Sequence, residues 1–157
     1  MPHRAARPRA ALAAAALAAG LAPAACDDPV RPGDLAGVYV LQSVAGDALP
    51  TVAYTTPGFA ARVLADTLRL AADGTGSEAR RAVNDPPAPD AGTPYATLSA
   101  FTYAVVGGRV EVTYVCPPNA DCVAGPHLVA RLEGGGLVVE QALAQRVPQV
   151  YARAGAR

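Results

Sequence analysis

The feature that most constrains the fold of this chain is a regular alternation of apolar and polar side chains on both sides of Gly107-Gly108. A Gly-Gly pair is a signal for a two-residue hairpin turn. Pairing outward from it sets one apolar face, made of Phe101, Tyr103, Val105, Val110, Val112 and Tyr114. A slip of one residue would turn this whole set toward water, so the register is strongly specified. The segment predicts an antiparallel hairpin with one buried face.

Two further turn signals predict hairpins on the same principle. Pairing outward from Asp73-Gly74 gives three opposed pairs: Leu68 with Ala79, Leu70 with Ser77, and Arg69 with Glu78 on the solvent side. The three glycines at 134–136 separate two segments whose apolar set is Leu128, Ala130, Leu132, Leu137 and Val139. Three successive hairpins indicate a meander.

Helical apolar spacing is missing from every window of ten or more residues in the body of the chain, which favours an all-β fold. Further strands are expected near 37–45, 51–55 and 150–153, and the Pro-rich stretch 84–94 is expected to be a loop. We expect an antiparallel up-and-down meander of about eight strands over residues 35–157. Closing it into a barrel would remove the exposed sheet edges.

Residues 1–25 have the layout of an export signal, which is expected to be helical. Three arginines, Arg4, Arg7 and Arg9, precede an apolar stretch at 10–22. A span of the bilayer needs about 20 apolar residues. This stretch is shorter, and acidic residues follow it closely. Residues 26–34, with two prolines and three aspartates, are expected to form an extended tether.

Cys26 follows the segment Leu21-Ala22-Pro23-Ala24-Ala25, which resembles the signal of bacterial lipoproteins. The resemblance implies that diacylglycerol is attached to the Cys26 thiol and that the chain is cleaved just before it. The protein would then be exported and anchored in a membrane, facing the periplasm or the cell exterior. The other interpretation is ordinary cleavage near Ala22-Pro23-Ala24 and secretion without lipid.

Cys116 and Cys122 flank a short turn-forming insert, and in an exported protein they are expected to form a disulfide. A metal site would have to recruit Asp121 and His127, but this spacing fits no standard zinc pattern. We therefore expect no metal site and no cofactor. His127, beside Pro126 at the start of a strand, is expected to be a surface residue.

The sequence offers no sign of catalysis or of nucleic-acid binding. None of its serines lies in a nucleophile-elbow motif, so we predict no catalytic residue and no enzymatic activity. After loss of residues 1–25 the chain keeps ten basic against thirteen acidic residues, a net charge of −3. Such a chain lacks the basic patch that holds nucleic acid.

Gly37-Val38-Tyr39 opens the first expected strand, and Tyr151 and Arg153 lie in the last one. This pattern resembles that of lipocalin-type barrels, in which Gly-x-Trp opens the barrel and an arginine of the last strand packs across the Trp. Tyr39 stands in place of the Trp. Residues 37–50 also look like the opening of uncharacterised lipocalin-like lipoproteins of environmental bacteria. The resemblance implies a fold more than an activity.

We expect a non-enzymatic binding module of the cell envelope. Its ligand would be a small apolar molecule inside the barrel, and the residues expected to line the cavity are Tyr39, Phe101, Tyr103, Tyr114 and Tyr151. The alternative is that these rings fill the interior and that the domain has a structural or protein-interaction role without a ligand. No protein partner can be named from the sequence.

Overall fold

The computed structural model describes residues 30–118, 120, 127–142 and 147–155. The predicted signal segment 1–25, the lipidation residue Cys26 and the first part of the tether lie outside these residues. So does Cys122, and its pairing with Cys116 stays a prediction. Within the described residues, no helix is both long enough and apolar enough to cross a membrane.

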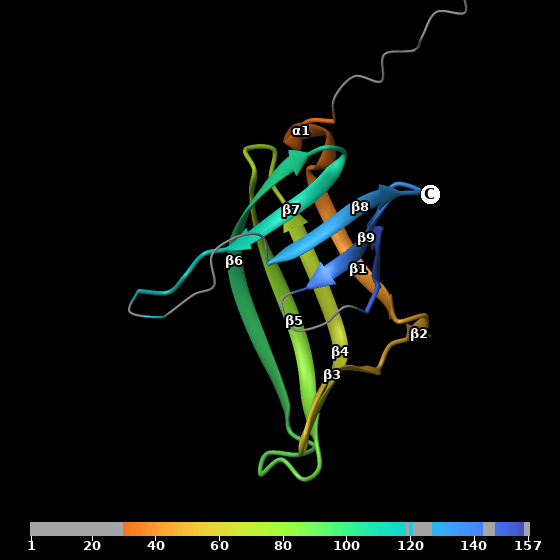
Figure 1. The fold of residues 1–157 in the computed structure, drawn as a ribbon, viewed down its shortest axis with the longest axis vertical. Helices are drawn as coiled ribbons and strands as arrows, with labels where there is room; N and C mark the ends of the chain where they lie inside the picture. Colours follow the sequence, from red (N-terminus) through yellow and green to blue (C-terminus); the bar gives the residue numbers. More distant parts are fainter. Residues whose placement is uncertain (1–29, 119, 121–126, 143–146, 156–157) are drawn as a thin grey trace, which may run out of the picture.

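Ten strands and one four-residue helix make up the described structure (Figure 1). In chain order they are α1 (Pro32–Leu35), β1 (Gly37–Val44), β2 (Asp47–Ala48), β3 (Thr51–Thr56), β4 (Phe59–Leu70), β5 (Thr75–Asp85), β6 (Pro94–Val106), β7 (Arg109–Tyr114), β8 (Leu128–Glu133), β9 (Gly136–Ala142) and β10 (Gln149–Arg153).

Eight of these strands form a closed antiparallel barrel. From β4 to β10 each strand pairs with the next along the chain, and β1 pairs with both β10 and β4. The strands β2 and β3 belong to the excursion between β1 and β4 and extend the sheet beyond the ring. The predicted all-β meander of about eight strands closing into a barrel is therefore confirmed.

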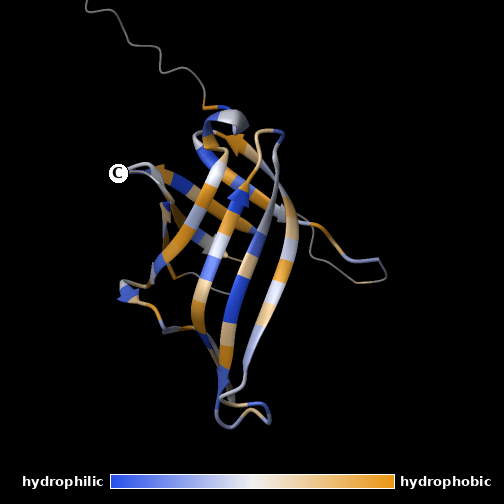
Figure 2. Cartoon of the chain, turned by 180° about the vertical axis from the view of Figure 1, so that it is seen from behind, coloured by the Kyte–Doolittle hydropathy of each residue, from blue (hydrophilic) through white to orange (hydrophobic). Residues whose placement is uncertain are grey.

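The register predicted for the β6–β7 hairpin is confirmed, and the apolar residues predicted to share a face of the β8–β9 hairpin lie in or against the core. In the β6–β7 hairpin, Val105 is opposite Val110, Tyr103 is opposite Val112, and Phe101 is opposite Tyr114. In the β8–β9 hairpin, Leu132 is opposite Leu137 and Ala130 is opposite Val139. Figure 2 shows the resulting alternation of hydrophobic and hydrophilic residues along the strands.

The predicted register of the β4–β5 hairpin is wrong by one residue. Leu68 is opposite Glu78, and Leu70 is opposite Gly76. The loop has three residues rather than two, because the Ala71 N–H donates to the Thr75 carbonyl across it. Its last residue, Gly74, has φ +84°, which fits a three-residue hairpin with glycine in the left-handed region. This register turns Glu78 from the solvent side to the interior.

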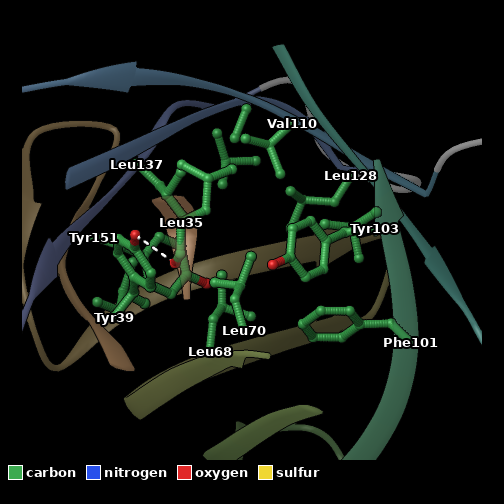
Figure 3. Packing of buried hydrophobic residues seen from close by; sticks show 14 of the residues in the cluster. Leu35, Tyr39, Leu68, Leu70, Phe101, Tyr103, Val110, Leu128, Leu137 and Tyr151 are labelled. Atoms are coloured by element: carbon green, nitrogen blue, oxygen red, sulfur yellow. Dashed lines mark hydrogen bonds between the residues drawn. The ribbon is translucent and has the colours of Figure 1, made fainter. Parts of the chain in front are cut away.

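One end of the barrel is filled by large side chains. Tyr39, Phe101 and Tyr151 are at most 1% exposed and belong to a single apolar cluster (Figure 3). The helix α1 covers this end, where Leu35 enters the cluster. The Tyr39 hydroxyl donates to the Leu35 carbonyl at 2.9 Å. Residues 32–34 thus belong to a helix that closes the barrel, and the predicted extended tether is wrong for them.

An arginine of the last strand contacts the start of the first strand at the filled end. The Arg153 guanidinium carbon lies 5.9 Å from the centroid of the Tyr39 ring. Its Nη2 atom donates to the Ala36 carbonyl. A Cβ at Gly37 would lie 2.9 Å from Arg153 Nε, so this glycine makes room for the guanidinium.

The barrel wall is much taller on one side than on the other. The strands β4, β5 and β6 have 12, 11 and 13 residues, whereas β7 to β10 have 6, 6, 7 and 5. The three long strands, with β3 paired to the first half of β4, project beyond the short ones (Figure 1). Strand pairing reaches Asp85 and resumes at Pro94, so the predicted loop 84–94 is shorter than expected.

Candidate ligand cavity

A cavity of about 420 Å³ opens at the end of the barrel opposite α1, against the tall side of the wall. This volume lies within the range of small-molecule sites. Its lining comes from strands β3 to β7, β9 and β10 and from the start of β8: Ala53, Tyr54, Ala61, Val63, Glu78, Arg80, Ala82, Tyr95, Thr97, Ser99, Tyr114, His127, Leu128, Ala142 and Gln149.

Small apolar side chains leave this end of the barrel hollow. Four alanines line the cavity, together with Val63 and Leu128. The filled end instead holds phenylalanine, tyrosine and leucine side chains (Figure 3). The barrel is therefore packed solid in one half and open in the other.

Of the five aromatic residues expected to line a cavity, the structure places one there. Tyr114 lines it, at the end of β7. The other four lie in the apolar cluster of the filled end: Tyr39, Phe101, Tyr103 and Tyr151. The Tyr103 hydroxyl lies 2.5 Å from the Ala71 carbonyl oxygen and 2.9 Å from the Pro32 carbonyl oxygen of α1, and its single proton serves one of them at a time.

A cluster of charged side chains forms the polar part of the cavity. Arg80 on β5 approaches Asp66 on β4 through both Nε and Nη2, each 2.8 Å from Asp66 Oδ2. The same Nη2 lies 2.8 Å from Glu78 Oε1. Asp66 is fully buried beneath the cavity, whereas Glu78 and Arg80 line it. One guanidinium thus serves two carboxylates.

Side chains from the opposite wall complete this cluster. The Tyr114 hydroxyl donates to Glu78 Oε2. The Tyr151 hydroxyl lies 3.0 Å from Asp66 Oδ2 and 3.2 Å from Gln149 Oε1, and its single proton serves one of them at a time. Because β4, β5, β7 and β10 all contribute, the cluster exists only in the closed barrel.

Burial and the excess of negative charge perturb the acids of this cluster. The pKa of Asp66 is raised to about 7, first by loss of solvation and then by the nearby Glu78 carboxylate, with Arg80 opposing both. The pKa of Tyr114 is also raised, by burial and by Glu78. For Arg80, burial acts to lower the pKa, but the attraction of Glu78 and Asp66 outweighs it and the pKa rises. The guanidinium is therefore the permanent charge of the cluster, and Asp66 is the group able to change its protonation near neutrality.

His127 was expected at the surface, and this prediction is wrong. Its side chain is buried and lines the cavity. The Tyr114 backbone N–H donates to His127 Nδ1 at 3.2 Å. The backbone N–H of His127 donates to the Val112 carbonyl at 2.8 Å. Since Nδ1 accepts a hydrogen bond, the ring proton is on Nε2. These bonds fix the ring against Tyr114, with 5.7 Å between the ring centroids.

Sequence reasoning missed Asp66, Glu78, Arg80 and Gln149. For Asp66 a signal was present. It lies two and four residues before the core residues Leu68 and Leu70, so its side chain is expected on the same face of the strand. For Glu78 the signal was hidden by the predicted hairpin register, which placed it on the solvent side, and Arg80 lies two residues further along the same strand. Within the described residues no group of three or more His, Cys, Asp or Glu side chains could hold a metal ion.

Comparisons of this chain with models of protein families, with curated proteins and with solved structures find no match.

Proposed function

We propose that this chain is an exported, lipid-anchored, non-enzymatic binding protein of lipocalin-like type that holds a small, largely apolar molecule. The observation that carries this proposal is the cavity of about 420 Å³ at the open end of a barrel whose other end is filled. Pockets of this size, mostly apolar with a few converging polar groups, are typical of small-molecule sites.

The packing of Arg153 against Tyr39 supports the lipocalin-like part of the proposal. The resemblance implies an arginine of the last strand across the aromatic residue that opens the first. The distance of 5.9 Å between the guanidinium carbon and the ring centroid is within the range of a cation–π contact.

The place where the chain enters the barrel supports a role at a membrane. The helix α1 lies at the filled end and Cys26 precedes it by six residues in the sequence, so an anchor on Cys26 would be attached near that end (Figure 1). The open end would then face away from the membrane and be free to receive a ligand.

The binding proposal is tested with the full chain, produced in an exporting bacterium and purified in mild detergent. Native mass spectrometry measures whether a small molecule co-purifies, and calorimetry measures binding of 1-decanol as an apolar probe. We expect saturable binding of one decanol per chain. If no probe binds and no molecule co-purifies, the alternative role, a structural or interaction domain without a ligand, replaces this one.

The anchor and the disulfide are tested on the same preparation. We expect Cys26→Ser to move the protein from the membrane fraction to the soluble fraction and to remove the lipid mass from the N-terminal peptide. We expect Cys116 and Cys122 to resist alkylation until a reductant is added. Unmodified Cys26 in the membrane fraction would refute lipidation.

A further inference from the structure

One half of β6 is an open edge of the sheet. This strand pairs with β5 along residues 94–102, but its pairing with β7 begins only at Phe101. The last hydrogen bond on the β7 side is donated by the Val115 N–H to the Ala100 carbonyl, at 2.9 Å. Within the described residues no strand pairs with residues 94–99 on this side. These residues, the free edge of β6, belong to the tall wall of the barrel (Figure 1).

The backbone groups that face the open side can be identified from their neighbours. In an antiparallel strand the N–H and C=O of one residue point to the same side, and successive residues alternate. The Tyr103 N–H donates to the Gly74 carbonyl just before β5, at 2.7 Å, whereas the Ala100 carbonyl accepts on the β7 side. The same alternation turns Ala96 and Leu98 toward the open side. In the part of the chain that the structure describes, their N–H and C=O groups have no strand partner there.

The free edge of β6 lacks the features that usually prevent pairing. Natural sheet edges are commonly blunted by charged side chains, bulges or prolines within the strand. Residues 95–99, Tyr-Ala-Thr-Leu-Ser, carry no charge, and the β5–β6 register runs without a shift. The edge strand β3 differs, since a register shift interrupts it between Val52 and Tyr54. Leu98 is 78% exposed. The free edge of β6 is therefore regular, uncharged and able to pair.

A twofold axis at Thr97 makes this edge complementary to itself. Ala96 then lies opposite Leu98 of a second copy, and each of the two pairs of this kind exchanges both of its backbone hydrogen bonds. Thr97 faces its own copy in a non-hydrogen-bonded pair, and Tyr95 faces Ser99. A symmetric pair brings each residue near its own copy, so a charged edge would repel itself. Residues 95–99 avoid this repulsion because they carry no charge.

The end of the free edge also fits a second copy. The pairing has to stop where Val115 already lies opposite Ala100. In the symmetric register, the residue of the second copy that reaches this position is Pro94. Proline has no N–H, so no donor is left there without an acceptor. An unrelated strand would in general bring an N–H to this blocked position. The edge therefore fits a second copy of this chain better than an extended segment of another protein.

We propose that two copies of this chain associate through the free edges of β6, in an antiparallel pair centred on Thr97, so that the two tall walls form one continuous sheet. The interface is isologous, because both copies use the same edge. Tyr95, Thr97 and Ser99 also line the cavity, so the two cavities lie on either side of the shared seam.

Cysteine pairing at the axis tests the register on the full-length chain in mild detergent. The Cα atoms of a non-hydrogen-bonded pair are about 4.5 Å apart, which a disulfide can bridge. We expect Thr97→Cys to form a disulfide-linked dimer under mild oxidation. The matched control, Thr102→Cys at an exposed position where β6 pairs with β7, should not form it, and neither should the wild type with its own cysteines. Equal cross-linking of the two variants, or none in Thr97→Cys, would overturn the proposal.

Sedimentation equilibrium measures the association itself. We expect the mass of the wild type to rise toward that of two chains as the protein concentration increases. Leu98→Pro removes an N–H that no strand of the same chain uses, so the fold should be kept. The dimer loses one hydrogen bond from each copy and should dissociate at least about tenfold more readily. Leu98→Lys should weaken it as well, because it places like charges at the seam. Thermal unfolding checks that both variants are folded.

Two outcomes of the sedimentation experiment would refute the dimer. One is a wild type that stays monomeric up to about 0.5 mM, and the free edge would then be open to a strand of another protein. The other is a wild-type dimer that neither Leu98 variant weakens, which would place the interface elsewhere. Cys26→Ser, measured in parallel, removes any contribution from lipid anchors that share a detergent micelle.

Discussion

Asp66 is the residue where burial and charge conflict most. It has no exposed surface, it shares one guanidinium with Glu78, and one of its oxygens has no donor. Its raised pKa of about 7 is the physical consequence, because the protonated form avoids both the solvation cost and the repulsion by Glu78. The cluster therefore makes the stability of the fold depend on pH.

We expect the free energy of unfolding to fall as pH rises from about 4 to about 7. The unfolded pKa of an aspartate is about 3.9, so over this window the folded protein binds more protons than the unfolded chain does. The slope from this single group is at most about 1.4 kcal/mol per pH unit. Asp66→Asn should remove it, and the exposed control Asp47→Asn should keep it. Urea unfolding at four pH values measures both, and an unchanged slope in Asp66→Asn would contradict the assignment.

Glycine is required at position 76 because the Phe101 ring packs closely against its backbone, not because the chain turns there. It is directly opposite Phe101, and an added Cβ would lie 2.2 Å from Phe101 Cε2 and 2.6 Å from the Arg69 carbonyl oxygen. We expect Gly76→Ala to destabilise the fold by about 1–3 kcal/mol, because the ring and the backbone cannot both move away. Gly33→Ala, with open space around it, should change stability by less than about 0.5 kcal/mol. Urea midpoints compare the two, and equal effects would argue against the packing of Phe101 described here.

At the level of elements, the four-residue helix α1 acts as a lid on the filled end. A helix this short is not stable by itself. It is held by its contacts with the barrel, where Leu35 is buried and its carbonyl accepts a hydrogen bond from Tyr39, while the Pro32 carbonyl shares the Tyr103 hydroxyl with the Ala71 carbonyl. The domain therefore begins before β1.

We expect Leu35→Ala to cost about 2–5 kcal/mol in unfolding free energy, as for other leucines removed from a core. Val30→Ala, at an exposed position just before the helix, should cost less than about 0.5 kcal/mol. Chemical denaturation provides both values. A negligible effect of Leu35→Ala would mean that α1 is part of the tether after all.

At the level of the whole molecule, unequal strand lengths divide the barrel into two halves. Where all eight strands are present, large side chains meet and fill the interior. Toward the open end the short strands stop, and small side chains of the longer strands leave a cavity that the ends of the short strands also line. The filled end therefore provides the packed core, and the proposed binding site lies at the other end of the same sheet.

This division predicts opposite effects for two alanine substitutions. Ala130→Leu, at a position with no exposed surface in the filled half, should cost about 1–3 kcal/mol of stability. Ala142→Leu, in the cavity lining, should leave stability within about 0.5 kcal/mol. It should also weaken decanol binding by about tenfold or more, because it takes up ligand volume. Thermal unfolding and calorimetry measure the two effects. If Ala142→Leu lowers stability and leaves binding unchanged, the cavity is not the binding site.

The class of the fold could be predicted from the sequence because the period of two in β6, β7, β8 and β9 is a local property. Each glycine pair fixes its own register, and the apolar faces then require one interior. The register of β4 and β5 could not be predicted in the same way, since a two-residue and a three-residue loop are both compatible with Asp73-Gly74. That single choice decides whether Glu78 faces solvent or the interior.

The sequence by itself therefore determined the meander, its hairpins and the apolar inner face of β6 and β7, because alternation and turn residues act over short distances. Only the tertiary structure decided which half of the barrel is hollow and which charged groups meet there. The ionic cluster draws Asp66, Arg80, Tyr114 and Tyr151 from four strands, and Asp66 is 85 residues from Tyr151 along the chain. Such a contact depends on the closure of the barrel and on the length of each strand. Neither property can be predicted from a local sequence pattern.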